Sequence, residues 1–245
     1  MTAWPYPRWI AHRGAGQIAP ENTLAAFKRG ARHGHTMFEC DVKLSADGVP
    51  FLLHDSTLDR TTNGHGLGGQ HLWAELGALD AGSWHSSDFA GEALPTLDAV
   101  AALCLAHGWR LNLEIKPSPG TEALTGRVVA DAAARLWAGA PMMPLLSSFQ
   151  IPALTAARSA QPQLPRGLLL GTVPADWLAT AAQLECTAVI CQHAVWTGAV
   201  MALATKAGLK TLAYTVNDMA TAQRLFALGL DALITDRVDL FAPGD

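Results

Sequence analysis

The sequence predicts a single α/β domain with the fold of a TIM barrel, and three observations support this prediction. Short apolar strands alternate with helical segments along most of the chain, as they do in successive βαβ units. Eight of these strands could run parallel, which is the number that closes such a barrel. The length of 245 residues and the hydrophobic content of 50% suit one barrel with a large core.

The predicted barrel strands are short apolar runs, as expected of strands that are covered on both faces. They begin near residues 9, 37, 110, 144, 166, 188, 210 and 232. The first helix follows Pro20 and Glu21, with Asn22 or Thr23 as its N-cap, and is expected to end near Gly34. The later helices are expected over residues 96–107, 122–138, 152–160, 175–184, 198–207 and 219–228.

The segment from Phe38 to Asp55 is predicted to form a strand, a tight turn and a returning strand. Asp47-Gly48 favours a two-residue hairpin turn, because glycine tolerates the positive φ that such a turn requires. With these residues at the centre of the turn, Asp41 would lie opposite His54. The return strand is not a barrel strand, because so short a turn cannot make a parallel crossover.

Residues 56–95 are rich in Gly, His, Trp and Ser and show little periodicity. We interpret this segment as a small insertion, which lies over one end of a single domain that spans residues 1–245.

Charged side chains occur where the first three predicted barrel strands end. They are His12 and Arg13, Glu39 and Asp41, and Glu114 and Lys116. Because the carboxyl ends of barrel strands meet at one face, we expect these six side chains to converge there. Carboxylates that lie close together repel one another, and hard cations such as Mg²⁺ or Ca²⁺ take oxygen ligands. The carboxylates therefore predict a divalent cation site, with imidazoles suited to proton transfer and Arg and Lys suited to a phosphate.

Two polar features of this region have other interpretations. Asn112 shares the face of Glu114 but lies lower in the barrel, so we expect it to be a buried hydrogen-bonding residue. Residues 14–19 match the G-x-G-x-x-[GA] fingerprint of dinucleotide-binding proteins. Pro20 and Glu21 intervene before the helix, and the strand that carries Glu39 continues into a hairpin, so a dinucleotide site is disfavoured.

Composition excludes several classes of partner. The formal net charge of −4 gives no basic footprint for nucleic acid. No apolar run approaches the roughly 20 residues of a membrane span, and the N-terminus lacks the basic and apolar regions of a secretory signal. Four cysteines without C-x-x-C spacing are expected to be buried free thiols. We therefore expect a cytoplasmic protein without stable membrane insertion.

Seven motifs occur in order along nearly the whole chain. They are H-R-G with P-E-N-T over residues 12–23, E-C-D-V-x-L-S-x-D-G-V-P-x-x-x-H-D over 39–55, D-R-T-T-N-G over 59–64, L-P-T-L over 94–97, L-E-I-K-P over 113–117, A-Y-T-V-N over 213–217 and I-T-D over 234–236. In this combination the chain resembles the glycerophosphodiester phosphodiesterase family. Two mild departures are Cys40, where an aliphatic residue is common, and Tyr214, where the family often has Trp.

The resemblance implies a TIM barrel with an insertion after the second conserved histidine. It also implies metal-dependent hydrolysis of glycerophosphodiesters, a small-molecule substrate class, to sn-glycerol 3-phosphate and an alcohol. The site residues that it implies are His12 and His54 as the acid–base pair, Glu39, Asp41 and Glu114 as ligands of Mg²⁺ or Ca²⁺, Arg13 and Lys116 as phosphate contacts, and Tyr214 on the substrate side.

Two other functions are compatible with the same barrel. An enzyme that acts on lysophospholipids or phosphoinositides would favour an apolar rim, for which Trp73, Trp84 and Phe89 are candidates. These aromatics fit better as a small core of the insertion. A phosphodiester-binding protein without catalysis would need no pair of histidines. The sequence leaves open the roles of the two histidines, attack by water or by a glycerol hydroxyl, the head group, the metal and the oligomeric state, a homo-oligomer included.

Overall fold

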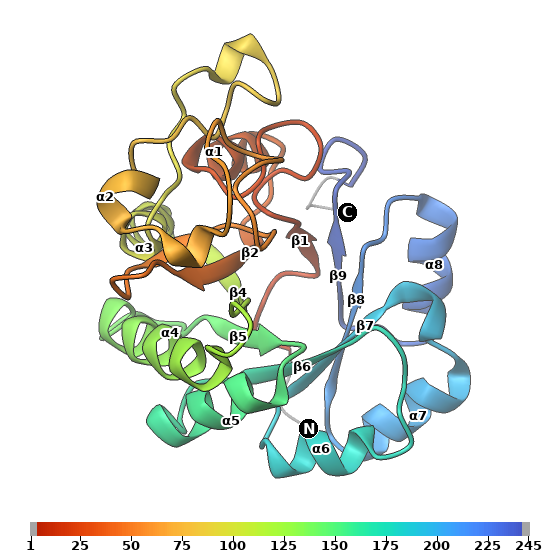
Figure 1. Ribbon diagram of the computed structural model, residues 1–245. Helices are drawn as coiled ribbons and strands as arrows, with labels where there is room; N and C mark the ends of the chain where they lie inside the picture. The colour runs from red at the N-terminus through yellow and green to blue at the C-terminus, as the bar shows by residue number, and fades with distance from the viewer. Residues whose placement is uncertain (1–3, 242–245) are drawn as a thin grey trace.

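The computed structural model describes residues 4–241, and eight parallel strands close into a TIM barrel, which confirms the predicted fold (Figure 1). The barrel strands are β1 (Trp9–Ala11), β2 (Met37–Leu44), β4 (Arg110–Ile115), β5 (Leu145–Ser148), β6 (Arg166–Leu170), β7 (Ala188–Gln192), β8 (Lys210–Tyr214) and β9 (Ala232–Thr235). The sheet order is β1-β9-β8-β7-β6-β5-β4-β2, and an additional pairing of β1 with β2 completes the ring. Each strand begins within one residue of its predicted start.

Helices surround the ring of strands (Figure 1). They are α1 (Leu24–Arg32), α3 (Leu97–His107), α4 (Glu122–Leu136), α5 (Ile151–Ala160), α6 (Trp177–Gln183), α7 (Gly198–Lys206) and α8 (Met219–Ala227). The N-cap of α1 is Thr23, whose side chain accepts a hydrogen bond from the Ala26 N–H. Asn22, the other predicted cap, has a positive φ of 60° and instead bonds to a residue of the candidate site.

The hairpin register predicted from Asp47-Gly48 is wrong by one residue. Strand β3 (Pro50–Leu52) pairs antiparallel with β2, with Leu44 opposite Pro50, and residues 45–49 form the loop. Ser45 holds this longer loop, because its hydroxyl accepts from the Val49 N–H at 2.9 Å and donates to Asp47 at 2.6 Å. Among residues 45–49, Gly48 is the one with a positive φ, at 82°. Consequently Leu53, not His54, lies beside Asp41, and its N–H donates to the Asp41 carbonyl at 3.1 Å.

The segment between β3 and α3 contains α2 (Trp73–Leu76) and the 3-10 turns η1 (Gly68–Gln70) and η2 (Ser87–Phe89), and a third such turn, η3 (His193–Val195), follows β7. Leu58, Leu76, Ala81 and Leu94 of the segment are buried together with Phe51 and Leu53, and Trp73 packs against them. The other two aromatics do not join this cluster: Phe89 packs on the main core, and Trp84 is 39% exposed.

Apolar side chains fill both the inside of the barrel and the layer between strands and helices. One cluster that joins opposite strands contains Ile10, Met37, Leu145, Ile190 and Leu212. Leu169 and Ile234 belong to the same cluster, and they also contact the hollow described below. The apolar packing thus ends at the carboxyl ends of the strands, where the polar side chains begin. No helix within residues 4–241 is long and apolar enough to cross a membrane.

Helices α4 and α5 pack closely because residue 126 is a glycine. A Cβ atom added to Gly126 would lie 2.1 Å from the Ala153 carbonyl oxygen, whereas one added to Gly198 in α7 would meet no atom within 4 Å. We therefore expect Gly126→Ala to destabilise the protein by about 1–3 kcal/mol through overpacking, although alanine favours helices.

The measurement is the melting temperature, which should fall by roughly 2–10 °C in Gly126→Ala. The matched control Gly198→Ala should leave it unchanged or raise it slightly. A Gly126→Ala variant as stable as the control would contradict the close approach of the two helices.

Candidate active site

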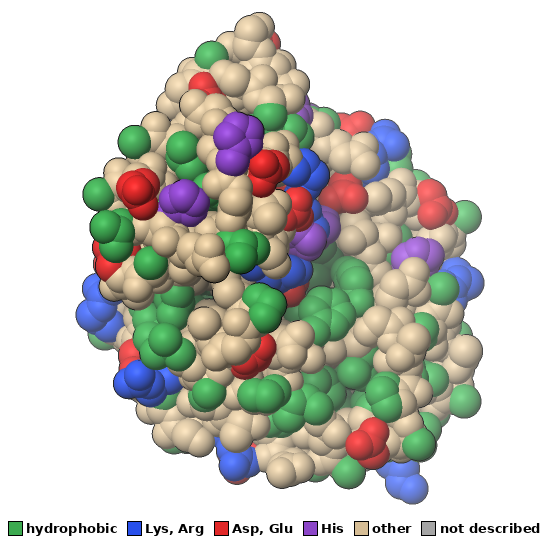
Figure 2. Space-filling view, viewed as in Figure 1, with side chains coloured by type: hydrophobic (Ala, Val, Ile, Leu, Met, Phe, Trp, Pro, Cys, Tyr) green, Lys and Arg blue, Asp and Glu red, His purple; other side chains and the backbone are tan. Residues whose placement is uncertain are grey.

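A hollow of about 190 Å³ lies at the carboxyl end of the barrel and collects most of the predicted site residues. Its lining residues are His12, Arg13, Glu39, His54, Asn112, Glu114, Lys116, Phe149, Leu169, Tyr214, Thr215 and Ile234. In Figure 2, charged and histidine side chains gather on one side of the central hollow, and hydrophobic side chains face them. Seven of the eight predicted residues line the hollow, and Asp41 adjoins it in the acidic cluster described next.

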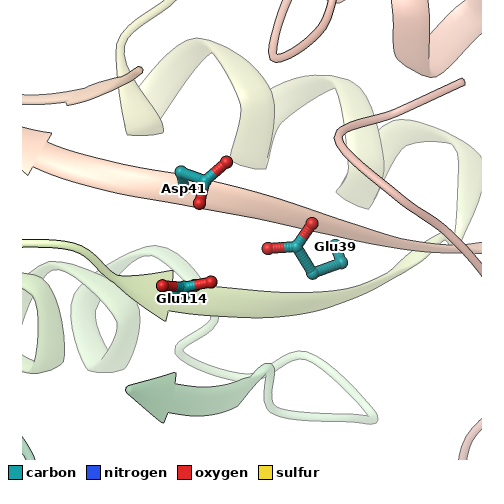
Figure 3. A group of neighbouring side chains, drawn as sticks. All are labelled: Glu39, Asp41 and Glu114. Carbon is teal, nitrogen blue, oxygen red and sulfur yellow. The ribbon is translucent and has the colours of Figure 1, made fainter. Parts of the chain in front are cut away.

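Glu39, Asp41 and Glu114 form a buried acidic cluster, here called the carboxylate cluster (Figure 3). One oxygen from each side chain lies within 4.8 Å of the other two. The sheet produces this arrangement. Glu39 and Asp41 are two residues apart on β2 and therefore point to the same face, and Asp41 is in register with Glu114 on β4. Three oxygen donors at this spacing fit a hard divalent cation.

The environment of the carboxylate cluster separates its three pKa values. Burial raises the pKa of Glu39 well above its usual value, and the charges of Asp41 and Glu114 add to this effect. Burial and the charge of Asp41 raise the pKa of Glu114 to about 7. For Asp41 burial acts in the same direction, but Lys116 and Arg13 outweigh it and hold the pKa well below its usual range. Burial thus favours the neutral forms of Glu39 and Glu114, and the two cationic side chains favour the ionised form of Asp41.

Two cationic side chains line the hollow beside the carboxylate cluster. Lys116 Nζ lies 2.9 Å from Glu114 Oε1 and 3.2 Å from Asp41 Oδ1. Arg13 has a positive φ of 51°, and its Nε lies 3.5 Å from Asp41 Oδ2 without a hydrogen-bond partner within residues 4–241. Both cations can therefore contact an anion that binds in the hollow.

His12 follows the end of β1 and is held by an aspartate from the other end of the chain. Its Nδ1 donates to Asp236 Oδ1 at 2.6 Å, while Nε2 lies 3.8 Å from Glu39 Oε2. Asn217 fixes Asp236 in turn, because its Nδ2 donates to Asp236 Oδ2 at 2.9 Å and its Oδ1 accepts from the Asp236 N–H at 2.9 Å. A carboxylate on Nδ1 places the proton there and leaves Nε2 free to exchange a proton in the hollow.

His54 is held in the same way by Asp55, whose Oδ1 accepts from Nδ1 at 2.7 Å. Arg60 of the insertion donates to both oxygens of Asp55, at 2.7 and 3.0 Å, and to both oxygens of Glu21, each at 2.8 Å. Glu21 also accepts from Arg13 Nη1 at 2.8 Å. The guanidinium of Arg60 therefore links the insertion to both His54 and Arg13.

Two asparagines differ in how their amides are used. Asn22 Nδ2 donates to Asp41 Oδ2 at 2.9 Å, and the Asp41 N–H donates back to Asn22 Oδ1 at 3.1 Å. Asn112 is buried as expected, but the expected hydrogen bonds to protein neighbours are absent among the described residues. Its side chain is 1% exposed, and neither Nδ2 nor Oδ1 has a partner within residues 4–241. An unpartnered amide in the lining of the hollow suits contact with water or ligand rather than with the core.

Sequence reasoning identified the charged groups and Tyr214 that face the hollow, but not the other lining residues, such as Phe149 and Thr215. It also missed the side chains that orient the charged groups. Those missed are Glu21, Asn22, Asp55, Arg60, Asn217 and Asp236. All six lie inside the motifs that carry the family resemblance. A signal for two of them was present, since a histidine that exchanges protons commonly has a carboxylate on its second nitrogen, and Asp236 follows a barrel strand.

The glycines of the dinucleotide-type fingerprint have a structural explanation. Gly14 and Gly16 both have positive φ, at 96° and 58°. A Cβ atom on Gly16 would lie 2.1 Å from the Asp236 carbonyl oxygen, and one on Gly14 would lie 2.8 Å from Ala26 Cβ. These glycines let the loop after β1 pack against the end of β9 and against α1, which accounts for the motif without a pyrophosphate.

Known proteins share both the sequence and the fold of this chain. The family model described as "Glycerophosphoryl diester phosphodiesterase family" matches residues 12–240. A putative glycerophosphodiester phosphodiesterase, YhdW, from Bacillus subtilis is 34% identical over 239 residues, which cover 94% of each chain. A glycerophosphodiester phosphodiesterase from Caldanaerobacter subterraneus is 32% identical, with 93% of each chain covered.

The fold comparison agrees with the sequence comparison. A phosphodiesterase from Oleispira antarctica, solved in complex with the product sn-glycerol-3-phosphate, superposes with a TM-score of 0.90 at 36% identity. The match covers 94% of this chain and 93% of that chain. With a barrel, a polar hollow and matches of this extent in agreement, the chain belongs to the glycerophosphoryl diester phosphodiesterase family.

Proposed function

We propose that this phosphodiesterase cleaves glycerophosphodiesters to sn-glycerol 3-phosphate and an alcohol, with a divalent cation and with His12 and His54 as the acid–base pair. The observation that carries the proposal is that both imidazoles line one hollow with Glu39 and Glu114 of the carboxylate cluster, and that each imidazole has an aspartate on Nδ1. The product in the complex of the Oleispira relative supports the identity of the product.

The carboxylate cluster suits Mg²⁺ or Ca²⁺, because all three ligands are oxygens from buried side chains. When bound, the cation would supply a Lewis acid that polarises the phosphodiester and offsets its negative charge. Arg13 and Lys116 border the cluster and would bind the phosphoryl oxygens, where charge builds as the bond to the leaving group breaks.

The two imidazoles would move the protons of the reaction. One takes the proton of the nucleophile and the other protonates the departing alkoxide, which in-line displacement places on opposite sides of phosphorus. Asp236 and Asp55 stabilise whichever imidazole becomes positively charged and fix its orientation. The same groups serve a water nucleophile or the free glycerol hydroxyl next to the phosphate.

The apolar wall of the hollow would contact the carbon atoms of glycerol. Tyr214 and Phe149 pack edge to face with ring centroids 5.8 Å apart, and the Tyr214 hydroxyl donates to the Leu170 carbonyl at 3.2 Å. Burial raises the pKa of Tyr214 to about 12, so the phenol keeps its proton. Tyr214 is therefore proposed as a substrate contact through its ring.

The structure favours neither alternative function. A lipid-binding rim would need the three aromatics of the insertion to be exposed together. Trp73 and Phe89 instead pack against apolar clusters, and of the three only Trp84 is substantially exposed. A protein that only binds phosphodiesters would not need an aspartate behind each histidine. The cytoplasmic location stays a prediction, with which the free state of all four cysteines agrees.

Replacement of Glu114 tests the cation. Metal at a hundred times its Kd would stabilise the protein by about 2.7 kcal/mol, or roughly 5–10 °C in melting temperature. We expect Glu114→Gln to fold, to lose most of this rise with Mg²⁺ or Ca²⁺, and to lose nearly all activity. Glu75→Gln, at a side chain that is 61% exposed in the insertion, is the matched control. Unchanged metal affinity by calorimetry in Glu114→Gln would remove Glu114 from the site.

Substitution of each histidine tests the acid–base pair. His12→Ala and His54→Ala should each lower kcat on glycerophosphocholine by at least about a hundredfold and keep the metal-induced rise in melting temperature. A p-nitrophenyl leaving group needs little protonation, so it should rescue the variant that lacks the acid and not the one that lacks the base. His65→Ala, at an 86% exposed side chain, is the control. Rescue of neither variant, or near-normal kcat in either, would contradict this division of roles.

The role of Asp236 can be tested by combining its substitution with that of each histidine. An amide at position 236 donates to Nδ1 instead of accepting from it, so Asp236→Asn should lower kcat about 10- to 100-fold with a small change in KM. Because Asp236 acts through His12, adding Asp236→Asn to His12→Ala should cause almost no further loss. Added to His54→Ala, Asp236→Asn should lower kcat by the same factor as it does in the otherwise intact protein. Equal losses in both backgrounds would show that Asp236 acts independently of His12.

A further inference from the structure

A second hollow of about 130 Å³ adjoins the first on the side of β2, β4 and β5. The two share four lining residues, His54, Glu114, Lys116 and Phe149. The second alone is lined by Lys43, Ser56, Ile115, Pro117, Ser148 and Gln150. A substrate whose phosphate lies by the carboxylate cluster could therefore extend past His54 into this second hollow.

Lys43 is the unusual residue of the second hollow. It follows Glu39 and Asp41 on the same face of β2, and its side chain is among the most deeply buried in the described structure, at 1% exposure. Its ammonium carries three N–H donors, of which one has a partner within residues 4–241, the Lys116 carbonyl at 3.2 Å. Buried donors are normally paired, so the remaining donors of Lys43 suit a ligand that accepts hydrogen bonds.

The charge and size of the second hollow narrow the class of ligand. Two ammonium groups, Lys43 and Lys116, line it against one carboxylate, that of Glu114, which Lys116 already contacts at 2.9 Å. Ser56 and Gln150 add polar atoms. A head group with a fixed positive charge, such as choline, would meet both ammonium groups and could accept no hydrogen bond. Its volume of about 130 Å³ is room for a small polar group and falls below the roughly 300–1,000 Å³ of pockets that enclose drug-sized ligands.

We propose that the second hollow is the subsite for the departing alcohol, and that Lys43 makes it select a small polyhydroxy head group such as glycerol over choline. The proposal rests on the proposed function, since it names the alcohol that the same site releases. It also places the departing oxygen on the side of His54, which lines both hollows.

The test compares kcat/KM for three diesters of glycerol 3-phosphate whose second alcohol is glycerol, choline or methanol. The intact protein should prefer the glycerol diester to the choline diester by about tenfold or more, since one hydrogen bond to a charged donor is worth about that factor. Lys43→Met should lower this preference by about tenfold, and Lys43→Gln, which keeps an N–H donor, by less. Lys206→Met, an exposed lysine of α7, is the matched control.

A ratio between substrates does not depend on how much of a variant is folded, so partial unfolding of Lys43→Met does not affect it. Gln150→Ala changes an exposed residue of the same hollow and should lower the preference by a few fold. The inference is overturned if neither the Lys43 variants nor Gln150→Ala alter the preference, or if Lys43→Met slows all three diesters equally. Hydrolysis of none of the three by the intact protein would instead refute the proposed function.

Discussion

The mutual repulsion of three buried carboxylates is the constraint on which the rest of the site depends. Glu39, Asp41 and Glu114 share one end of β2 and β4, where burial and their own charges disfavour ionisation. The surroundings offset part of this cost. Lys116 and Arg13 contact Asp41, and the Asn22 amide donates a hydrogen bond to its carboxylate. Arg13 and Asn22 both adopt positive φ, so the backbone itself is strained to bring these groups to the carboxylates.

The two histidines depend on different parts of the chain. His12 and Asp236 are 224 residues apart in sequence and meet because β1 pairs with β9, which closes the barrel. His54 and Asp55 are neighbours in sequence, and they depend on Arg60 and therefore on the packing of the insertion. One half of the proposed acid–base pair thus reflects the closure of the ring, and the other reflects the folding of a surface segment.

Sequence reasoning predicted the starts of the barrel strands within one residue, because apolar runs covered on both faces have few other structures available. The hairpin register was harder, since the Ser45 hydroxyl and the Asp47 carboxylate stabilise a longer loop than Asp47-Gly48 alone suggests. Residues at strand ends were identifiable by chemistry. The side chains that hold them were not identifiable, because Asp236, Arg60 and Glu21 reach the site through tertiary contacts that strand spacing does not encode. Asn112 is buried as predicted, but the lack of a protein hydrogen-bond partner for its amide within residues 4–241 is visible only in three dimensions.

The pairing of β1 with β9 also has a consequence during protein synthesis. A ribosome releases residue 12 long before residue 236, so the His12 imidazole has no Asp236 partner until residue 236 has been made. Long-range strand pairing of this kind is slow to form and follows the local elements. Hydrolysis that depends on this pair would begin only when the ring is complete. Turnover would then report that β1 and β9 have paired and that the ring is closed.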